Sequence, residues 1–557
     1  MLHSKGPLLS IDVSARETKT EDIDEVLSNF IGGRGVGTKL AHDRIPFDAD
    51  PFDAENRLYL TTGPLQVSSM SFTGRMSATA VSPLTTGLLS SNAGGFLSRH
   101  FADTGISTLE ITGASDELLA IHVTDDGVEF EPVPDLEGAT VHEVTDYMED
   151  NYGLSEDHIA AIGPAGENLV RFASIMTTDH RAFGRGGLGA VLGSKNVKAL
   201  TFEGDSSPEI EMPDVAEDIH RGGATSDSIM KRQGTTSVTD LANEAGTFPS
   251  YYFRETSYPK SEAINGDRVE EKKYKKATCS KCAFACKLPT RDEATGLETE
   301  GPEFETIMAF GGNCDIDNIV SIMKSNDQCD RFGMDAISAG NTVAAYLAAN
   351  DEFGNEELVH ELVEKIAYRE DEGDLLAEGI HRIHDELGVE DWTVKGLDFS
   401  AHDGRNIHGQ GFSFATANRG ADHMYSTFYA WEYPLVDQDE AVDPRGLEGK
   451  PPMIVEQEQR RALEDAGILC RFSRGEQTKD RVVKLFGADY DELLTVGERI
   501  ITLERHFNNQ RGFDRSDDTL PYDLPDFESA LDEYYELHGW NDDGTVPDGR
   551  MEEVAAL

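Results

Sequence analysis

Three cysteines stand within eight residues, at Cys279, Cys282 and Cys286, in a chain that holds only six. The spacing C-x2-C-x3-C lets one loop bring three thiolates to one side of a metal centre. Structural zinc sites usually pair one C-x2-C with a second pair, whereas iron–sulfur clusters are typically held by four cysteine thiolates. The segment therefore predicts an iron–sulfur cluster whose fourth ligand comes from elsewhere in the chain.

The net charge of the chain indicates which solution conditions and which partners suit the protein. The 557 residues carry a formal charge of −55, spread along the sequence and not gathered in a tail. Such a surface repels itself at low ionic strength, so we expect a halophile's protein, kept folded in salt that screens the repulsion. A surface that binds basic partners is the alternative. Nucleic acid is excluded as a partner because its phosphates would be repelled.

Cysteine usage and hydropathy bear on the compartment. Few and clustered cysteines fit a reducing compartment, in which thiols serve metals and not disulfides. No apolar run is long enough to cross a bilayer, and the N-terminal residues contain no leader-like apolar segment. We therefore expect a cytoplasmic protein with no membrane partner.

The first two hundred residues are predicted to be rich in strands. Short runs that favour β structure alternate with glycine-rich turns, and they cover residues 8–14, 57–62, 77–83, 108–113, 118–124 and 197–204. After residue 205 the pattern becomes helical, with long helices expected over 338–350 and 356–387.

We expect an α+β protein with three domains. One boundary lies near residue 204, and a second lies near residue 395, where a glycine-rich segment begins. The chain would then hold an N-terminal β-rich, cofactor-binding domain (1–204), followed by two mainly helical domains, 205–395 with the cysteine triplet and 396–557.

Three glycine-rich segments are candidates for binding phosphate, at residues 32–37, 91–96 and 180–189. Glycine lets backbone amides approach an anion, and arginine adds a bidentate charge. The third segment, which holds two arginines, is the best of them. It also matches G-x-G-x-x-G, but a dinucleotide fold needs a full helix before the next strand. That strand begins only eight residues after Gly189, so the nicotinamide interpretation is disfavoured.

These segments together resemble the tungsten-containing aldehyde ferredoxin oxidoreductase family, nearly from end to end. The run RGGLGAVLGSKNVKA and the cysteine triplet carry most of the resemblance. In that family two pterins hold tungsten beside one 4Fe–4S cluster, and a D-x-x-G-L-C/D motif occurs once for each pterin. The resemblance therefore implies a bis-pterin centre of tungsten or molybdenum, with the N-terminal domain binding pterin.

Two hexapeptides resemble that motif. Residues 330–335 match the first copy with methionine for leucine, and 465–470 resemble the second with the glycine displaced by one, which puts the local turn in doubt. The resemblance implies that Cys470 is the fourth cluster ligand. It assigns to the pterins the side chains of Asp330, Met334, Asp335, Asp465, Cys470 and Arg471. A carboxylate only accepts hydrogen bonds and so suits a heterocycle rich in N–H groups.

Magnesium that bridges the pterin phosphates is implied as well, which suits an ion that binds mainly phosphates and water. On one side the phosphates would be held by Arg75 and the turn from Asn92 to Gly94. On the other side the resemblance implies four residues of the third glycine segment, which are Arg181, Ala182, Phe183 and Arg185.

The catalytic candidates are His423 and one of two glutamates, Glu303 or Glu305, in segments that resemble the family's active site. Histidine could donate to a carbonyl oxygen and glutamate could take a proton from water. If the glutamates share a strand, alternation would turn only one of them toward the metal. Glu378 and His381 form an E-x-x-H that could hold an intersubunit metal, although chance explains it better. Cys314 and Cys329 are expected to be free or buried thiols.

The reaction implied is the oxidation of an aldehyde by water to a carboxylic acid, with electrons passing to ferredoxin. The alternatives are a relative that reduces an aromatic acyl thioester or an acid, and a non-catalytic iron–sulfur electron carrier. We also expect a homodimer. Ferredoxin could dock on lysines that crowd around the triplet in this acidic chain, namely Lys272, Lys273, Lys275, Lys276, Lys281 and Lys287.

Overall fold

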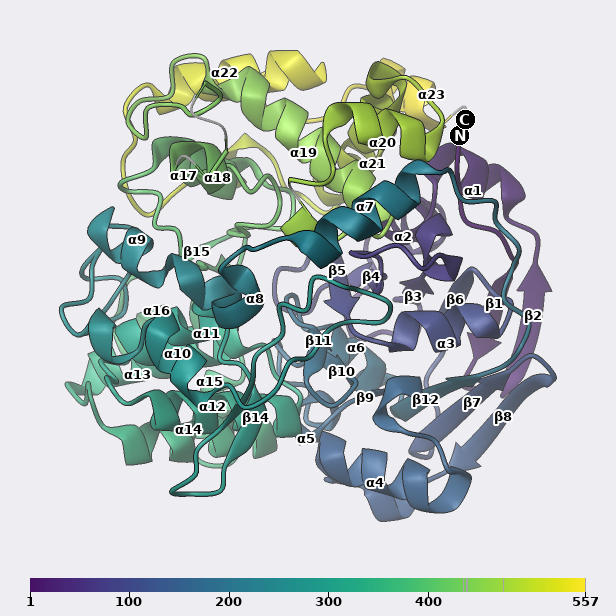
Figure 1. The fold of residues 1–557 in the computed structure, drawn as a ribbon, viewed down its shortest axis with the longest axis horizontal. Helices are drawn as coiled ribbons and strands as arrows, with labels where there is room; N and C mark the ends of the chain where they lie inside the picture. The colour runs from purple at the N-terminus through teal and green to yellow at the C-terminus, as the bar shows by residue number, and fades with distance from the viewer. Residues whose placement is uncertain (434, 437–438, 474, 556–557) are drawn as a thin grey trace.

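The computed structural model describes residues 1–433, 435–436, 439–473 and 475–555. It confirms the α+β class: strands gather on one side of the molecule, and the helices of the later segments cover the rest (Figure 1). Two six-stranded mixed sheets form within the first 204 residues, and helices dominate after them. None of the helices in the described part of the chain is long and apolar enough for a membrane crossing.

The first sheet has the strand order β2-β1-β6-β3-β4-β5. Strand β1 pairs in parallel with β6, and all the other pairs are antiparallel. The sheet is built from β1 (Leu8–Asp12), β2 (Glu17–Glu21), β3 (Leu58–Thr61), β4 (Arg75–Val81), β5 (Leu88–Gly94) and β6 (Thr108–Thr112). Strands β3 and β4 are almost wholly buried, so their sequences are continuous apolar and small-residue runs.

The second sheet has the order β11-β10-β9-β12-β7-β8, with β7 and β12 parallel. It contains β7 (Leu119–Thr124), β8 (Gly127–Pro132), β9 (Ile159–Ala161), β10 (Ile175–Thr177), β11 (Arg181–Phe183) and β12 (Val197–Glu203). All six runs predicted as strands form strands, namely β1, β3, β4, β6, β7 and β12. The prediction missed β2 and β8, which lack buried apolar faces, the short β9, β10 and β11, and also β5, whose sequence is rich in serine and glycine.

Several helices pack around these sheets. They are α1 (Asp24–Phe30), α2 (Gly33–Arg44), α3 (Leu97–Asp103), α4 (Val141–Tyr152), α5 (Pro164–Glu167) and α6 (Leu188–Ser194). The first glycine segment begins α2 and is not a β-turn. A Cβ on Gly33 would lie 2.1 Å from the carbonyl oxygen of Asp465, so glycine is required where α2 meets a helix from the far end of the sequence.

The middle of the chain is helical, with two small hairpins. It contains α7 (Val215–Thr225), α8 (Met230–Gln233), α9 (Thr239–Glu244), α10 (Gly266–Lys272), β13 (Pro289–Arg291), β14 (Glu298–Glu300), α11 (Phe304–Thr306), α12 (Ile319–Phe332), α13 (Ala336–Asn350), α14 (Glu356–Tyr368), α15 (Glu372–Leu376), α16 (Ile380–Leu387), β15 (Thr393–Val394) and β16 (Leu397–Asp398). The second expected domain boundary, near residue 395, falls in the turn between β15 and β16.

The single helix expected over 356–387 is wrong, because the structure divides it into α14, α15 and α16. Arg369 and Asp371 adopt positive φ angles, and Gly379 has φ +83°. Gly373 lies against the end of α14, where a Cβ would come within 2.2 Å of Lys365. Two tight reversals thus fold three short helices onto one another, which an apolar periodicity alone does not reveal.

The C-terminal part is again helical. Its elements are α17 (His408–Thr416), α18 (Tyr429–Glu432), α19 (Lys450–Ala466), α20 (Lys479–Phe486), α21 (Tyr490–Gln510), α22 (Phe527–His538) and α23 (Asp548–Ala555). Apolar residues of α2 and of α19 and α21 share one core. Within it the Arg34 guanidinium makes two 2.7 Å contacts with the Glu504 carboxylate, both almost fully buried.

Candidate functional site

Four cysteines line one small pocket. Cys279, Cys282 and Cys286 lie in the loop before β13, and Cys470 follows α19 directly. The amide of Cys470 donates to the carbonyl of Phe72 at 2.8 Å, which fixes the fourth thiol against the N-terminal domain. The structure therefore gathers the four thiols that a 4Fe–4S cluster needs.

Cations surround this pocket. Burial opposes ionisation of Cys279, yet Lys287, Arg181 and Arg75 together lower the pKa of this thiol below its usual value. Burial raises the pKa of Cys470. Since a thiolate is the form that binds iron, the three cations favour the ligand state at Cys279. The donor set fits an iron–sulfur cluster.

The end of β5 lies against the cysteine loop. A Cβ on Gly94 would come within 3.3 Å of Cys279 Sγ and 3.1 Å of an Arg75 nitrogen. Arg75 is held in place by the side chain and carbonyl of Asn92. The three residues expected to hold phosphate and magnesium are therefore adjacent to the cluster pocket.

The two hexapeptides occupy equivalent positions at the ends of helices. Asp330 lies in the last turn of α12 and Asp465 in the last turn of α19. Three residues after each aspartate the chain takes a left-handed conformation, at Gly333 (φ +74°) and at Ile468 (φ +60°). The turn that the displaced glycine placed in doubt is present in both copies, and in the second copy a β-branched residue adopts it.

The two aspartates have different neighbours. The Asp330 carboxylate lies 3.4 Å from His180 and accepts from Asn326 at 3.2 Å, and burial raises its pKa. The Asp465 carboxylate pairs with Arg34 at 3.3 Å and Arg471 at 2.8 Å. Arg471 Nε is buried without a hydrogen-bond partner, so a polar acceptor group beside Asp465 would be bound well.

The two arginines of the third glycine segment have different surroundings. Arg181 pairs with Glu300 and lies near Cys279, whereas Arg185 contacts Asp398 at 3.2 Å and Asp335 at 3.5 Å. The other predicted residues of this region have structural environments: Ala182 and the buried Phe183 lie in β11, the buried Met334 bridges to Ala173, and Asp335 caps α13.

The two candidate glutamates do not share a strand, so the alternation of a strand does not apply to them. Glu303 precedes α11 and Glu305 lies within it, and the helical turn lets both line the same cavity. Glu303 accepts from the Thr235 hydroxyl. Glu305 faces the candidate histidine: its Oε1 lies 3.4 Å from His423 Nε2, and its Oε2 accepts from the Ala401 amide at 2.7 Å.

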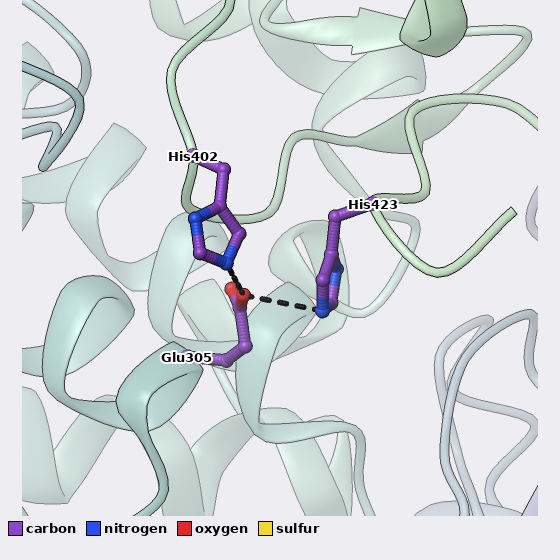
Figure 2. A group of neighbouring side chains, drawn as sticks. All are labelled: Glu305, His402 and His423. Carbon is purple, nitrogen blue, oxygen red and sulfur yellow. Dashed lines mark ion pairs between the residues drawn. The ribbon is translucent and has the colours of Figure 1, made fainter. Parts of the chain in front are cut away.

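A second histidine, which the sequence did not single out, completes this cluster. His402 Nε2 lies 3.9 Å from Glu305, and Figure 2 shows the carboxylate between the two imidazoles. The His402 ring stacks on Tyr429 at 3.7 Å, and its Nδ1 lies 3.1 Å from the Tyr433 hydroxyl. The only sequence signal was its position in a glycine-rich segment. The three side chains are close enough to hold a cation as well as to move a proton.

Burial changes the pKa of the Glu305 carboxyl group. Removal from solvent raises the pKa of Glu305, although the His423 imidazole opposes the shift. Glu305 Oε1 has no hydrogen-bond partner, and neither has His423 Nδ1. A carboxylate of raised pKa with a free oxygen is suited to taking a proton from a bound molecule.

These groups form the floor of a cavity of about 620 Å³. Three aromatic residues, Phe72, Phe284 and Phe472, line both this cavity and the cysteine pocket. The proton-transfer groups and the thiols therefore lie on opposite sides of an aromatic wall.

The remaining sequence candidates have other partners. Glu378 lies before α16 and pairs with Arg171 and with Arg369, whereas His381 contacts Asp391 at 2.8 Å. Their side chains therefore bond to different partners, and the structure gives no support to a shared metal. Cys314 and Cys329 are free and buried, as expected.

Not all six lysines near the triplet are available to a partner. Lys287 is buried, Lys272 pairs with Asp292 at 2.7 Å, and Lys273 donates to the Lys231 carbonyl. The exposed members are Lys275, Lys276 and Lys281.

A thiol pocket that adjoins a buried carboxylate and two histidines has the parts of an oxidoreductase. Comparison with known families makes the class specific: residues 8–204 match the aldehyde ferredoxin oxidoreductase N-terminal domain, and residues 214–555 match domains 2 and 3 of the same enzymes. The chain belongs to the aldehyde ferredoxin oxidoreductase family.

Full-length relatives support the same family assignment. The chain is 34% identical to a tungsten-containing aldehyde ferredoxin oxidoreductase of Thermococcus kodakarensis and 32% identical to one of Pyrococcus furiosus, over 99% of this chain and 98% of each relative. It is 25% identical to an aliphatic sulfonate oxidoreductase subunit of P. furiosus. The fold is also that of the active-site complex BamBC of benzoyl coenzyme A reductase, with a TM-score of 0.83 at 21% identity, over 99% of this chain and 96% of that one.

Proposed function

We propose that this protein is a cytoplasmic enzyme that oxidises an aldehyde and water to a carboxylic acid and delivers the two electrons to ferredoxin. The observation that carries the proposal is the Glu305–His423 pair, 3.4 Å apart on the floor of the cavity, with the pKa of the carboxyl raised by burial. The halophilic origin expected from the charge of −55 stays a prediction.

The proposed centre is a bis-pterin complex of tungsten or molybdenum with a magnesium ion between the pterin phosphates. When bound, it would supply the two-electron redox chemistry of the reaction. Arg75, Asn92 and Gly94 would hold one end of it. Asp330 and Asp465 would accept hydrogen bonds from the pterin rings, one from each copy of the motif.

The chain's own residues supply the proton chemistry. His423 donates a hydrogen bond to the aldehyde oxygen and so polarises the carbonyl carbon. Glu305 takes a proton from the attacking water, so that R–CHO and H2O yield R–COOH, two protons and two electrons. His402, stacked on Tyr429, keeps the carboxylate turned toward the substrate. Cys279, Cys282, Cys286 and Cys470 would hold the 4Fe–4S cluster.

The test compares two neighbouring glutamates. Glu305→Gln keeps the shape of the side chain but removes the base, so kcat for aldehyde oxidation should fall on the order of 10²–10⁴-fold. Glu303→Gln is the matched control, since this carboxylate faces Thr235, and it should retain most activity. Tungsten, molybdenum and iron are measured in both variants. Equal losses in the two, or full activity in Glu305→Gln with intact metal content, would refute the assignment.

A further inference from the structure

The mouth of the catalytic cavity is apolar and exposed. Seven large apolar side chains are exposed in the described part of the chain, and three of them line this cavity, namely Ile229, Leu241 and Leu435, with 45%, 38% and 46% of their surface accessible. Isolated exposed apolar residues are ordinary on a protein surface. Three at the rim of one cavity form a patch, which marks a binding site.

The cavity lining as a whole exposes more apolar than polar surface. Met230, Val238, Met424 and Phe284 contribute to it, beside several serine and threonine hydroxyls. Methionine is flexible and polarisable, so it adapts to hydrocarbon groups of different shape. A hydrocarbon tail would therefore find apolar contacts in the cavity that also holds the Glu305–His423 pair.

The charges of the cavity disfavour anions. Three carboxylates line it, those of Glu303, Glu305 and Glu476, and the one arginine among the described lining residues is Arg471. That guanidinium already pairs with Asp465 at 2.8 Å and with Glu464 at 3.1 Å. A carboxylated or phosphorylated aldehyde would bring a further negative charge beside these carboxylates, and the lining arginine already has two carboxylate partners.

We propose that the cavity selects uncharged aldehydes that carry an alkyl chain or aromatic ring of about six carbons or more, a size that a cavity of several hundred cubic ångströms can enclose. Ile229 and Leu241 at the rim are the specificity-determining residues. This selectivity rests on the proposed function, because it concerns the aldehyde that reaches Glu305.

The experiment uses the holoenzyme and a series of linear aldehydes from propanal to octanal. If each added methylene is buried against the wall, kcat/KM should rise about fourfold per methylene until the chain emerges from the cavity. An aldehyde of similar length that ends in a carboxylate should react at least tenfold less efficiently than its uncharged counterpart.

Rim variants test the residues themselves. The double variant Ile229→Asn/Leu241→Asn should flatten the dependence on chain length, because kcat/KM should fall much more for octanal than for propanal. Leu537→Asn is the matched control, because Leu537 is 44% exposed on α22 and does not line the cavity. It should keep the parental dependence. Calorimetric binding of octanamide and propanamide, which do not react, should show the same loss for octanamide alone.

The outcomes distinguish a failure of the proposed selectivity from a failure of the proposed function. Aldehydes oxidised at rates independent of chain length, or an unchanged dependence in the double variant, would overturn the proposed selectivity and leave the proposed function standing. Octanamide binding that depends on the rim, without oxidation of any aldehyde, would overturn the proposed function and leave the apolar selectivity standing.

Discussion

Glu305 Oε1 and His423 Nε2 lie 3.4 Å apart, although α11 and the segment before α18 contribute them from different parts of the chain. Neither His423 Nδ1 nor Glu305 Oε1 has a hydrogen-bond partner. The pair therefore retains unused hydrogen-bonding capacity in the cavity.

His423→Ala should keep its metals and lose turnover. Removal of a positioned hydrogen-bond donor costs on the order of 10²–10⁴-fold in rate, and the cysteine pocket is lined by other residues. Steady-state rates with several aldehydes and elemental analysis check this. Near-parental activity would remove His423 from the mechanism, and wholesale metal loss would give it a structural role.

Cys470→Ala should lose the intact cluster, because a 4Fe–4S centre takes about four thiolates and the fourth would be missing. Iron content and the paramagnetic spectrum of the reduced protein are the measurements. Cys314→Ala serves as the control, since it also removes a buried thiol but lies outside the pocket. An unaltered spectrum in Cys470→Ala would exclude this residue as a ligand.

Exposed lysines beside the cluster should position ferredoxin. Replacing Lys275, Lys276 and Lys281 by glutamine removes the exposed positive charges of the loop, so the KM for ferredoxin should rise roughly threefold to tenfold. The rate with a small artificial dye should not change. The control carries the same charge change at exposed lysines away from this loop, in Lys5→Gln/Lys19→Gln/Lys484→Gln. A similar KM in both triple variants would leave the loop without a docking role.

Stability should fall in mildly alkaline solution because of His538. This imidazole is fully buried; burial disfavours its charge, but Glu498 at 2.9 Å outweighs that effect and raises the pKa of His538 to about 9. A raised folded pKa gives stabilisation that is complete below the unfolded value of about 6.5 and is lost as the pH rises through about 9. The free energy of unfolding should drop by up to about 3 kcal/mol over that range.

The same titration in His538→Gln should lack most of this slope. Denaturant unfolding at fixed salt, from pH 6 to pH 10, gives the free energies. His381→Gln, a change at an exposed histidine, should leave the slope as in the parent. A parental slope in His538→Gln would assign the pH dependence to other groups.

At position 468, a glycine variant should be more stable than an alanine variant, which reverses the usual order of stability. The residue is fully buried at φ +60°, a conformation that costs roughly 1–2 kcal/mol for a residue with a Cβ. Ile468→Ala and Ile468→Gly both lose the buried side chain, but only glycine relieves the strain. Ile468→Gly should therefore unfold with about 1 kcal/mol more free energy than Ile468→Ala. The ordinary order, with alanine the more stable, would show that the turn is not strained.

Local patterns in the sequence predicted much of this architecture. Strands with continuous apolar or alternating runs, such as β6 and β7, were predicted because burial determines their composition. The exposed β2 carries no such pattern. The reversal at Arg369 was missed because an arginine with positive φ has no local signature, whereas a glycine does.

The candidate site was predictable where its residues form motifs. The four cysteines and the two aspartates were identified by spacing and resemblance, and the structure brings the cysteines together. His402 was missed because its role depends on Tyr429 and Tyr433, which approach it only after folding. The choice between Glu303 and Glu305 also needed three dimensions, since α11 determines which carboxylate faces His423.

The buried contact between Arg34 and Glu504 has a consequence for how the protein is made. On the ribosome the first domain emerges long before α21. The Arg34 guanidinium therefore has no Glu504 carboxylate to pair with until almost the whole chain has been synthesised. The Asp465 side of the cofactor region is likewise incomplete until then. A fragment that ends at residue 204 would therefore expose the apolar faces of α2 that α19 and α21 normally cover.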